Sequence, residues 1–153
     1  HKSSVNSLSV PSSSSSLPAS LLLSASEDCT VRLWDTRDVS KSSSCTIRPL
    51  KSTSPKGING EITCATFTQT TAPNPEDIDD TFTIYCTTSD GTFLTYDLRY
   101  PDGPIIIPQP SASVSISPNE ELNDVSVAPQ RGTDKYSATC DDTGTITVLD
   151  VSA

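Results

Sequence analysis

The sequence contains no methionine and has little aromatic or basic character. Its 153 residues include one Trp, one His and 10 Lys or Arg against 19 Asp or Glu, which gives a formal net charge of −9. Such an acidic chain lacks the basic surface that binds nucleic acid or anionic membranes. No apolar run approaches the roughly 20 residues that a membrane-spanning helix needs. The absence of methionine predicts that the sequence is a segment of a longer protein.

The five cysteines show neither metal-ligand spacing nor a disulfide framework. No C-x-x-C pair occurs, and Cys64, Cys86 and Cys140 fall in predicted strands, where a cysteine usually acts as a small buried apolar residue. No N-x-S/T glycosylation acceptor occurs either. These absences favour a reducing, cytoplasmic or nuclear setting, and we expect neither a metal nor another cofactor.

One hairpin pattern occurs three times along the chain. In each copy an apolar run leads into a polar turn, and a strand of alternating apolar and polar side chains follows. Each copy ends in an aromatic residue or Leu followed by Asp, at Trp34-Asp35, Tyr96-Asp97 and Leu149-Asp150. An internal repeat of this kind decides the architecture, and here it predicts an all-β chain built from similar sheets.

The three copies resemble WD repeats, the units of β-propeller proteins. The resemblance implies a blade of four antiparallel strands for each copy, with the blades stacked radially. The blades would span residues 1–56, 57–117 and 118–153, and the outer strand of the third would be missing. Three blades cannot close a ring, so we expect about four more and a ring of about seven. The spacings of 62 and 53 positions between copies place surplus residues in loops, because ordinary WD repeats run about 40 to 45 residues.

Alternating patterns predict the strands within each blade. The first blade would use Val5–Val10, the hairpin 21–35 and Cys45–Leu50; the second Glu61–Thr68, 82–88, 92–97 and Ile105–Ile107; the third Leu122–Val127, Lys135–Cys140 and Thr145–Asp150. Prolines flank the Ile105–Ile107 run and would protect an exposed sheet edge. The connections include a Ser-rich loop, an acidic insertion at 69–80 and a turn-rich link at 51–60.

The resemblance also implies a hydrogen-bonded set of His, Ser or Thr, Asp and Trp inside a blade. The first copy carries the whole set: His1, Ser24 or Ser26, Asp28 and Trp34. The two serines are two positions apart and face the same side, so the sequence does not choose between them. The second copy keeps Asp90, with Ile58 and Tyr96 at the His and Trp positions; the third has Pro118, Thr143 and Leu149. Stability should therefore decrease from blade one to blade three, because buried polar groups need partners.

His1, Asp28 and Ser26 also suggest a catalytic arrangement. The repeat accounts for these residues as strand-pinning groups, and the sequence contains neither G-x-S-x-G nor a cluster with metal-ligand spacing. We therefore expect a binding protein and not an enzyme, with a propeller enzyme as the weaker reading.

An arginine follows the terminal pair of the first two copies. Trp34–Arg37 and Tyr96–Arg99 resemble the W-D-x-R boxes with which WD-repeat substrate receptors dock on the damaged-DNA-binding adaptor of cullin-RING ubiquitin ligases. The resemblance implies that Arg37 and Arg99, with Asp35 and Asp97, bind this adaptor, and a guanidinium group can bind carboxylates bidentately. The alternatives are arginines that form local ion pairs, and a generic peptide- or histone-binding scaffold without a ligase role. Every reading except the enzyme implies protein partners, without direct nucleic acid, membrane or small-molecule binding.

Overall fold

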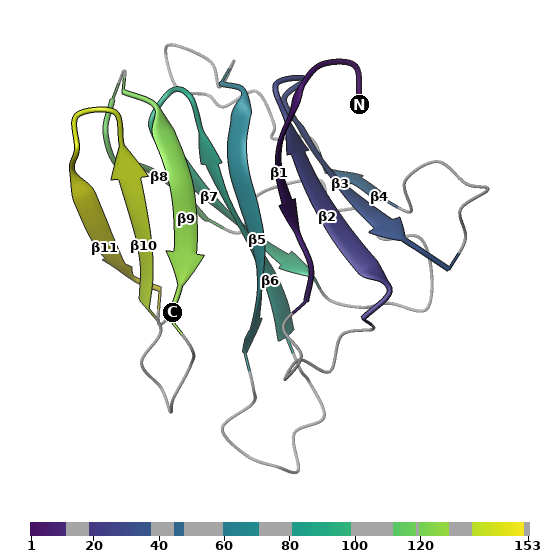
Figure 1. The fold of residues 1–153 in the computed structure, drawn as a ribbon. Coiled ribbons are helices and arrows are strands. Elements are labelled where there is room, and N and C mark those ends of the chain that lie inside the picture. Colours follow the sequence, from purple (N-terminus) through teal and green to yellow (C-terminus); the bar gives the residue numbers. More distant parts are fainter. Residues whose placement is uncertain are drawn as a thin grey trace.

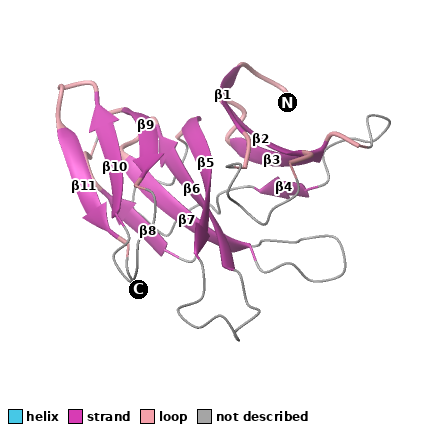
Figure 2. Ribbon diagram, turned by 60° about the horizontal axis from the view of Figure 1, so that its bottom comes forward, coloured by secondary structure: helices cyan, strands magenta, loops and turns pink. Residues whose placement is uncertain are grey.

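Three antiparallel β-sheets lie face to face in chain order in the computed structural model (Figure 1). The structure describes residues 1–11, 19–37, 45–47, 60–70, 81–98, 112–118, 120–128 and 136–151. Within these residues Figure 2 shows strands and loops, and no helix there is long and apolar enough to cross a membrane. The prediction of an all-β chain is confirmed.

Each sheet is built from strands that follow one another in the sequence. The first contains β1 (Val5–Ser9), β2 (Leu21–Ser26), β3 (Thr30–Asp35) and β4 (Cys45–Ile47), in this order. The second contains β5 (Ile62–Thr70), β6 (Thr81–Thr88), β7 (Thr92–Leu98) and β8 (Ala112–Ser115). The third contains β9 (Leu122–Val127), β10 (Tyr136–Asp141) and β11 (Ile146–Asp150). Each sheet therefore starts with its inner strand, and these strands, β1, β5 and β9, lie side by side in chain order.

The fourth strand of the second sheet corrects one prediction. The sequence pattern predicted this strand at Ile105–Ile107, but β8 pairs with β7 in a register that sets Thr92 opposite Ser115. The prediction was wrong because an edge strand with an exposed side needs no apolar alternation, and Val114 in β8 is indeed exposed. The Ile105–Ile107 run lies outside the described residues, as do most residues of the predicted loops at 11–20, 51–60 and 69–80. The last prediction was wrong at its start, because Gln69 and Thr70 extend β5 through its pairing with β6.

A three-residue turn, at 27–29, 89–91 or 142–144, follows the second strand of every sheet, and Thr145 separates the third turn from β11. Its last residue has a positive φ in each case: 59° at Cys29, 79° at Gly91 and 82° at Gly144. The amide of this residue donates to the carbonyl three positions earlier, at 3.1, 3.2 and 3.1 Å. The shared geometry aligns the copies, so that Ser26, Thr88 and Asp141 stand at matched positions before the turn.

Two apolar interfaces hold the three sheets together. The first sheet contributes Leu23, Ala25 and Val31, which are buried in one cluster with Ile62 and Ile84 of the second sheet. The second sheet contributes Tyr85 and Phe93, whose rings stack with centroids 5.4 Å apart and pack with Leu122 and Val125 of the third sheet. Each interface thus joins the forward face of one sheet, which points toward the next sheet in the chain, to the backward face of its successor.

Candidate functional site

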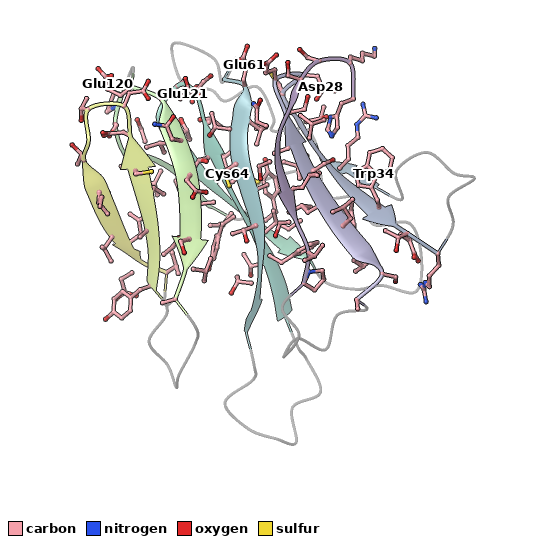
Figure 3. All side chains as sticks on the ribbon, in the orientation of Figure 1. Asp28, Trp34, Glu61, Cys64, Glu120 and Glu121 are labelled. Atoms are coloured by element: carbon pink, nitrogen blue, oxygen red, sulfur yellow. The ribbon has the colours of Figure 1, made fainter. Side chains whose placement is uncertain are left out.

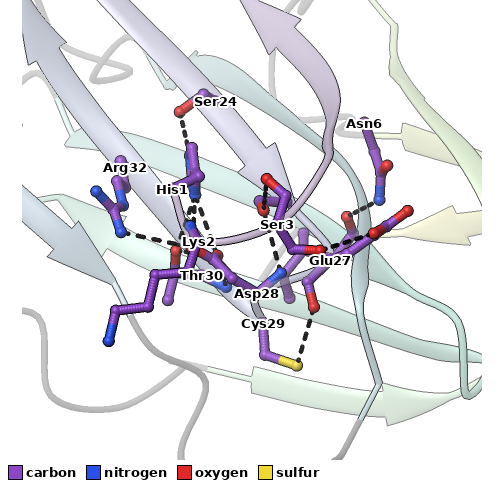
Figure 4. A network of polar contacts seen from close by, with 12 residues as sticks. His1, Lys2, Ser3, Asn6, Ser24, Glu27, Asp28, Cys29, Thr30 and Arg32 are labelled. Carbon is purple, nitrogen blue, oxygen red and sulfur yellow. Dashed lines mark hydrogen bonds and ion pairs between the residues drawn. The ribbon is translucent and has the colours of Figure 1, made fainter.

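The turn carboxylate of Asp28 is the centre of a polar network in the first sheet (Figure 4). It accepts hydrogen bonds from the backbone amides of Lys2, at 2.8 Å, and Thr30, at 3.1 Å, and from Nδ1 of His1, at 3.0 Å. Burial acts to raise the pKa of Asp28, but the hydrogen bonds from Thr30 and Lys2 and the positive charge of Arg32 lower it below its ordinary value. The carboxylate is therefore charged and pins the chain start to the hairpin turn.

His1 links this carboxylate to Trp34 through Ser24. Nε2 of His1 lies 2.7 Å from Oγ of Ser24, and the indole N–H of Trp34 donates to the same oxygen at 2.8 Å. The Ser24 hydroxyl can accept from the Trp34 indole and donate to Nε2 of His1, which then donates through Nδ1 to Asp28. A neutral imidazole satisfies the whole relay.

Asp28, His1 and Ser24 have the connectivity of a hydrolytic triad, but their surroundings suit a structural role. Ser24 is 3% exposed, and its oxygen already accepts from Trp34, so a substrate carbonyl has no approach to it. Ser26, the other serine that the sequence left open, accepts from the amide of Asp28 at 3.1 Å and donates to the carbonyl of Ser3. The two serines thus serve different parts of the network.

The second sheet keeps only part of this network. The hydroxyl of Thr88 donates to Asp90 inside the turn. Cys86 and Tyr96 occupy the matched positions of Ser24 and Trp34, and both are fully buried. The Tyr96 hydroxyl has no hydrogen-bond partner among the described residues, and burial raises the pKa of Tyr96. Ile58, at the expected His position, lies outside the described residues.

The third sheet rebuilds the turn around Asp141, a residue that the sequence pattern missed. Thr143 stands where the carboxylate was expected and donates to Asp141 through its hydroxyl, at 2.6 Å, and its amide, at 3.0 Å. Ser117 also donates to Asp141, at 2.7 Å, and these hydrogen bonds lower the pKa of Asp141 from 3.8 to about 2. Thr139, at the Ser24 position, is buried and has no partner among the described residues. The adjacent acids Asp141 and Asp142 were the signal available in the sequence.

Asp35 and Arg37 form an ion pair at the end of β3. This end of the first sheet is opposite the end with the hairpin turn, where Asp28 lies (Figure 3). Nε of Arg37 donates to Oδ1 of Asp35 at 2.9 Å, and Nη2 donates to Oδ2 at 2.5 Å. This bidentate contact lowers the pKa of Asp35, and the Arg37 side chain is 69% exposed. Arg99 lies outside the described residues, and for Asp97 the structure gives only its place in β7. The structure thus positions one of the two predicted arginines.

A row of polar side chains crosses the three inner strands. Ser7, Cys64 and Asp124 occupy matched positions in β1, β5 and β9; Ser7 Oγ lies 3.5 Å from Cys64 Sγ, and the thiol donates to Asp124 at 3.0 Å. Burial raises the pKa of Cys64 and keeps the thiol protonated as a donor. Cys64, Cys86 and Cys140 are free thiols, and no group of described His, Cys, Asp or Glu residues is arranged to hold a metal ion.

Comparison with known proteins adds evidence from outside the chain. No protein-family model matches the sequence. A curated relative, WD repeat-containing protein 53 homolog from Dictyostelium discoideum, is 28% identical over 135 residues, which cover 86% of this chain. The chain resembles a WD-repeat protein. It spans only 29% of the relative's length.

The WD-repeat resemblance found in the sequence pattern is thereby confirmed. In sequence, the segments Thr83–Arg99, 119–123 and Ala138–Asp150 resemble WD repeat-containing protein 53. The polar network of the first sheet holds Lys2, Asp28 and Trp34 together through His1 and Ser24.

Proposed function

We propose that this chain is part of a protein-interaction scaffold that binds a partner through the W-D-x-R box at the end of β3. The observation that carries the proposal is the exposed, bidentate Asp35–Arg37 pair. The pair holds the guanidinium plane in one orientation, so less side-chain freedom is lost when a partner binds there. A guanidinium group at such a rim suits a partner surface that presents carboxylates or carbonyls.

The proposed partner is the damaged-DNA-binding adaptor of a cullin-RING ubiquitin ligase, which would make the whole protein a substrate receptor. The support is the sequence likeness of two boxes, Trp34–Arg37 and Tyr96–Arg99, at the ends of matched strands. The third copy has Val151 and Ser152 after its terminal Asp150 and carries no such box. The free thiols of Cys64, Cys86 and Cys140 suit the proposed cytoplasmic or nuclear location.

We also propose that the three sheets are consecutive blades, 1–56, 57–117 and 118–153, of a closed propeller with about seven blades. The support is the repeated packing of a forward face on a backward face, which can continue in both directions. The relative is more than three times longer than the aligned segment, which leaves room for further sheets in a protein of this kind.

A pull-down from cell extract tests the adaptor. The full-length protein is compared with the double variant Arg37→Ala/Arg99→Ala, and bound proteins are read by mass spectrometry. Lys2→Ala is the matched control, because it removes one positive charge next to the turn, at the opposite end of the hairpin. We expect the adaptor with the parent and with Lys2→Ala, and its loss with the double variant. Thermal melts should be nearly unchanged, since exposed ion pairs contribute little to stability.

The pull-down also separates the alternatives. An adaptor that binds the double variant as well as the parent would assign both boxes a structural role. If the adaptor never appears, the receptor role fails; histones or other basic peptides recovered in its place would favour the generic scaffold.

A further inference from the structure

Ser117 joins the hairpin turns of the second and third sheets. Its amide and the amide of Ile116 donate to the carbonyl of Gly91, at 3.3 and 2.9 Å, in the turn of the second sheet. Its hydroxyl donates to Oδ2 of Asp141, at 2.7 Å, directly before the turn of the third sheet. Ser117 lies in the connection between β8 and β9, and through these contacts it couples the two sheets.

Pro118, the residue after this serine, is exposed. The chain contains two Ser-Pro pairs, and the other, Ser54-Pro55, lies outside the described residues. Proline has a fixed φ and lacks a backbone N–H, so an enzyme can distinguish it from every other residue type after a serine. The pair therefore gives a serine on a surface connection the feature that a proline-directed protein kinase selects.

The surroundings of the Ser117 hydroxyl are acidic. Asp141 is charged, because it also accepts from two backbone amides of its hairpin, at 3.0 Å each. Glu120 and Glu121 follow on the same connection, at the turn end of the sheets (Figure 3). The Lys and Arg side chains among the described residues all lie in the segment of the first sheet: Lys2, Arg32 and Arg37. A new negative charge on Ser117 would therefore meet carboxylates and no described Lys or Arg.

We propose that Ser117 is phosphorylated by a proline-directed protein kinase, and that the phosphate separates the β8–β9 connection from the third sheet. The kinase transfers the γ-phosphoryl group of ATP: a bond forms between Oγ of Ser117 and the γ-phosphorus, the bond to the β-phosphate breaks, and ADP leaves. The hydroxyl proton passes through the kinase base to solvent. The phosphoserine has lost the proton that Asp141 accepted and carries about −1.5 to −2 charge, so repulsion replaces the hydrogen bond.

Phosphorylation requires the connection to open first. A kinase carries a catalytic aspartate that accepts the proton of the substrate hydroxyl, so the Ser117 hydroxyl must leave Asp141. This opening breaks that contact and the two hydrogen bonds to Gly91. The neighbouring β8 is an outer strand with an exposed Val114, so the opening is confined to the edge of the second sheet. Once the phosphate is present, the carboxylate of Asp141 opposes the return of the connection.

A kinase assay on the full-length protein tests the site. The protein is incubated with MgATP and a cyclin-dependent kinase, as a proline-directed enzyme, and phosphopeptides are located by mass spectrometry. A synthetic peptide of residues 112–123 is phosphorylated in parallel. We expect phosphate on Ser117 in the parent, none at this position in Ser117→Ala and much less in Pro118→Ala. Ser115→Ala is the matched control, because Ser115 is exposed on the same segment and precedes Ile116, and this variant should be phosphorylated like the parent.

Asp141→Asn tests whether the contact with Asp141 controls access to Ser117. A neutral amide oxygen accepts a weaker hydrogen bond than a carboxylate, so the serine should be phosphorylated about fivefold faster. Asp142→Asn is the control of equal charge, since Asp142 is exposed and its side chain accepts from Asn123. It should leave the rate unchanged.

Amide exchange read by mass spectrometry tests the structural consequence. Peptides within 112–127 and 136–150 should exchange about tenfold faster after phosphorylation, the factor for the loss of one hydrogen bond to a charged group. Peptides within 21–35 of the first sheet should not change. Ser117→Ala should give a smaller increase, because it removes the hydrogen bond without adding charge. A higher salt concentration should reduce only the effect of the phosphate, because salt screens the repulsion.

Four results would overturn the proposal. Absence of phosphate on Ser117, in the protein or in the peptide, would exclude the site, and equal phosphorylation of Pro118→Ala would exclude a proline-directed kinase. Equal rates for Asp141→Asn and the parent would mean that this contact does not control access. Unchanged or slower exchange of the phosphorylated protein would mean that the phosphate does not separate the connection from the third sheet. The adaptor pull-down depends on Arg37 and Arg99, so the two proposals fail independently.

Discussion

Two matched hydroxyl groups, Ser24 and Thr139, have opposite effects on stability because only one has partners. Ser24 serves both His1 and Trp34, so Ser24→Ala leaves two buried donors or acceptors without a partner. Thr139 is buried with no partner among the described residues. We expect Ser24→Ala to lower the free energy of unfolding by about 1–3 kcal/mol and Thr139→Val to raise it by about 1 kcal/mol. Urea unfolding followed by circular dichroism measures both, and equal losses would contradict this account.

Asp141 should make the stability of the third sheet depend on acid. Its pKa is lowered to about 2 in the folded protein from an ordinary value of 3.8. A carboxyl with a lowered folded pKa stabilises the fold above its unfolded pKa, and this contribution is lost as the pH falls from about 4 to about 2. Asp141→Asn should therefore be less stable than the parent near neutral pH, with a difference that shrinks across this window. Urea unfolding at several pH values tests it, and a constant difference would exclude ionisation as the cause.

The hydrogen-bonded polar residues could be predicted from the sequence in the first sheet but only in part in the third. Asp28 and Trp34 were identified because the first copy keeps every residue type of the pattern. Asp141 was missed because the third copy moves the carboxylate two positions, from within the turn to the strand before it. A pattern that fixes residue types at fixed positions does not show that a neighbouring side chain can supply the same hydrogen bonds from another direction.

The hairpin turns differ in how closely their glycines are packed. A Cβ on Gly144 would meet no atom within 4 Å, whereas one on Gly91 would lie 1.8 Å from the carbonyl oxygen of Ser117. Both glycines have a positive φ, so Gly144→Ala should cost about 1–2 kcal/mol from backbone strain alone. Gly91→Ala should cost about 1–3 kcal/mol more, because the segment after β8 must move. Thermal melts of the two variants compare these costs, and equal shifts would show that the contact relaxes freely.

The strands were predictable where one face is buried and not where an edge is exposed. β2, β3, β6 and β7 have alternating or continuous apolar side chains because each packs at least one face against a neighbouring sheet. β8 was misplaced because the exposed edge of a sheet imposes little on its sequence. The sequence also did not predict which sheet covers each apolar face. The alternation of Val31 and Leu33 indicates that one face of β3 is buried, but it does not identify the element that covers this face.

The three sheets should differ in local stability as whole units. The hydrogen-bonded polar sets alone predict that local stability decreases from the first sheet to the third. Packing predicts instead that the second sheet is the most stable, because both of its faces are covered. The third sheet has three described strands and an exposed apolar face. Among the matched central strands we expect amide exchange to be slowest in β6, faster in β2 and fastest in β10. Exchange read by mass spectrometry tests this order, and equal protection would mean that the sheets unfold as one unit.

Trp34 gives the molecule an optical asymmetry. It is the only tryptophan in the chain, and its indole N–H is held by Ser24 within the first sheet. Intrinsic emission at the tryptophan band therefore follows the environment of one sheet, while the far-ultraviolet dichroism sums the backbone of all three. If the third sheet unfolded alone, the wavelength of maximum tryptophan emission would stay constant, whereas the far-ultraviolet dichroism would decrease. The two signals together locate where in the row of sheets an unfolding event begins.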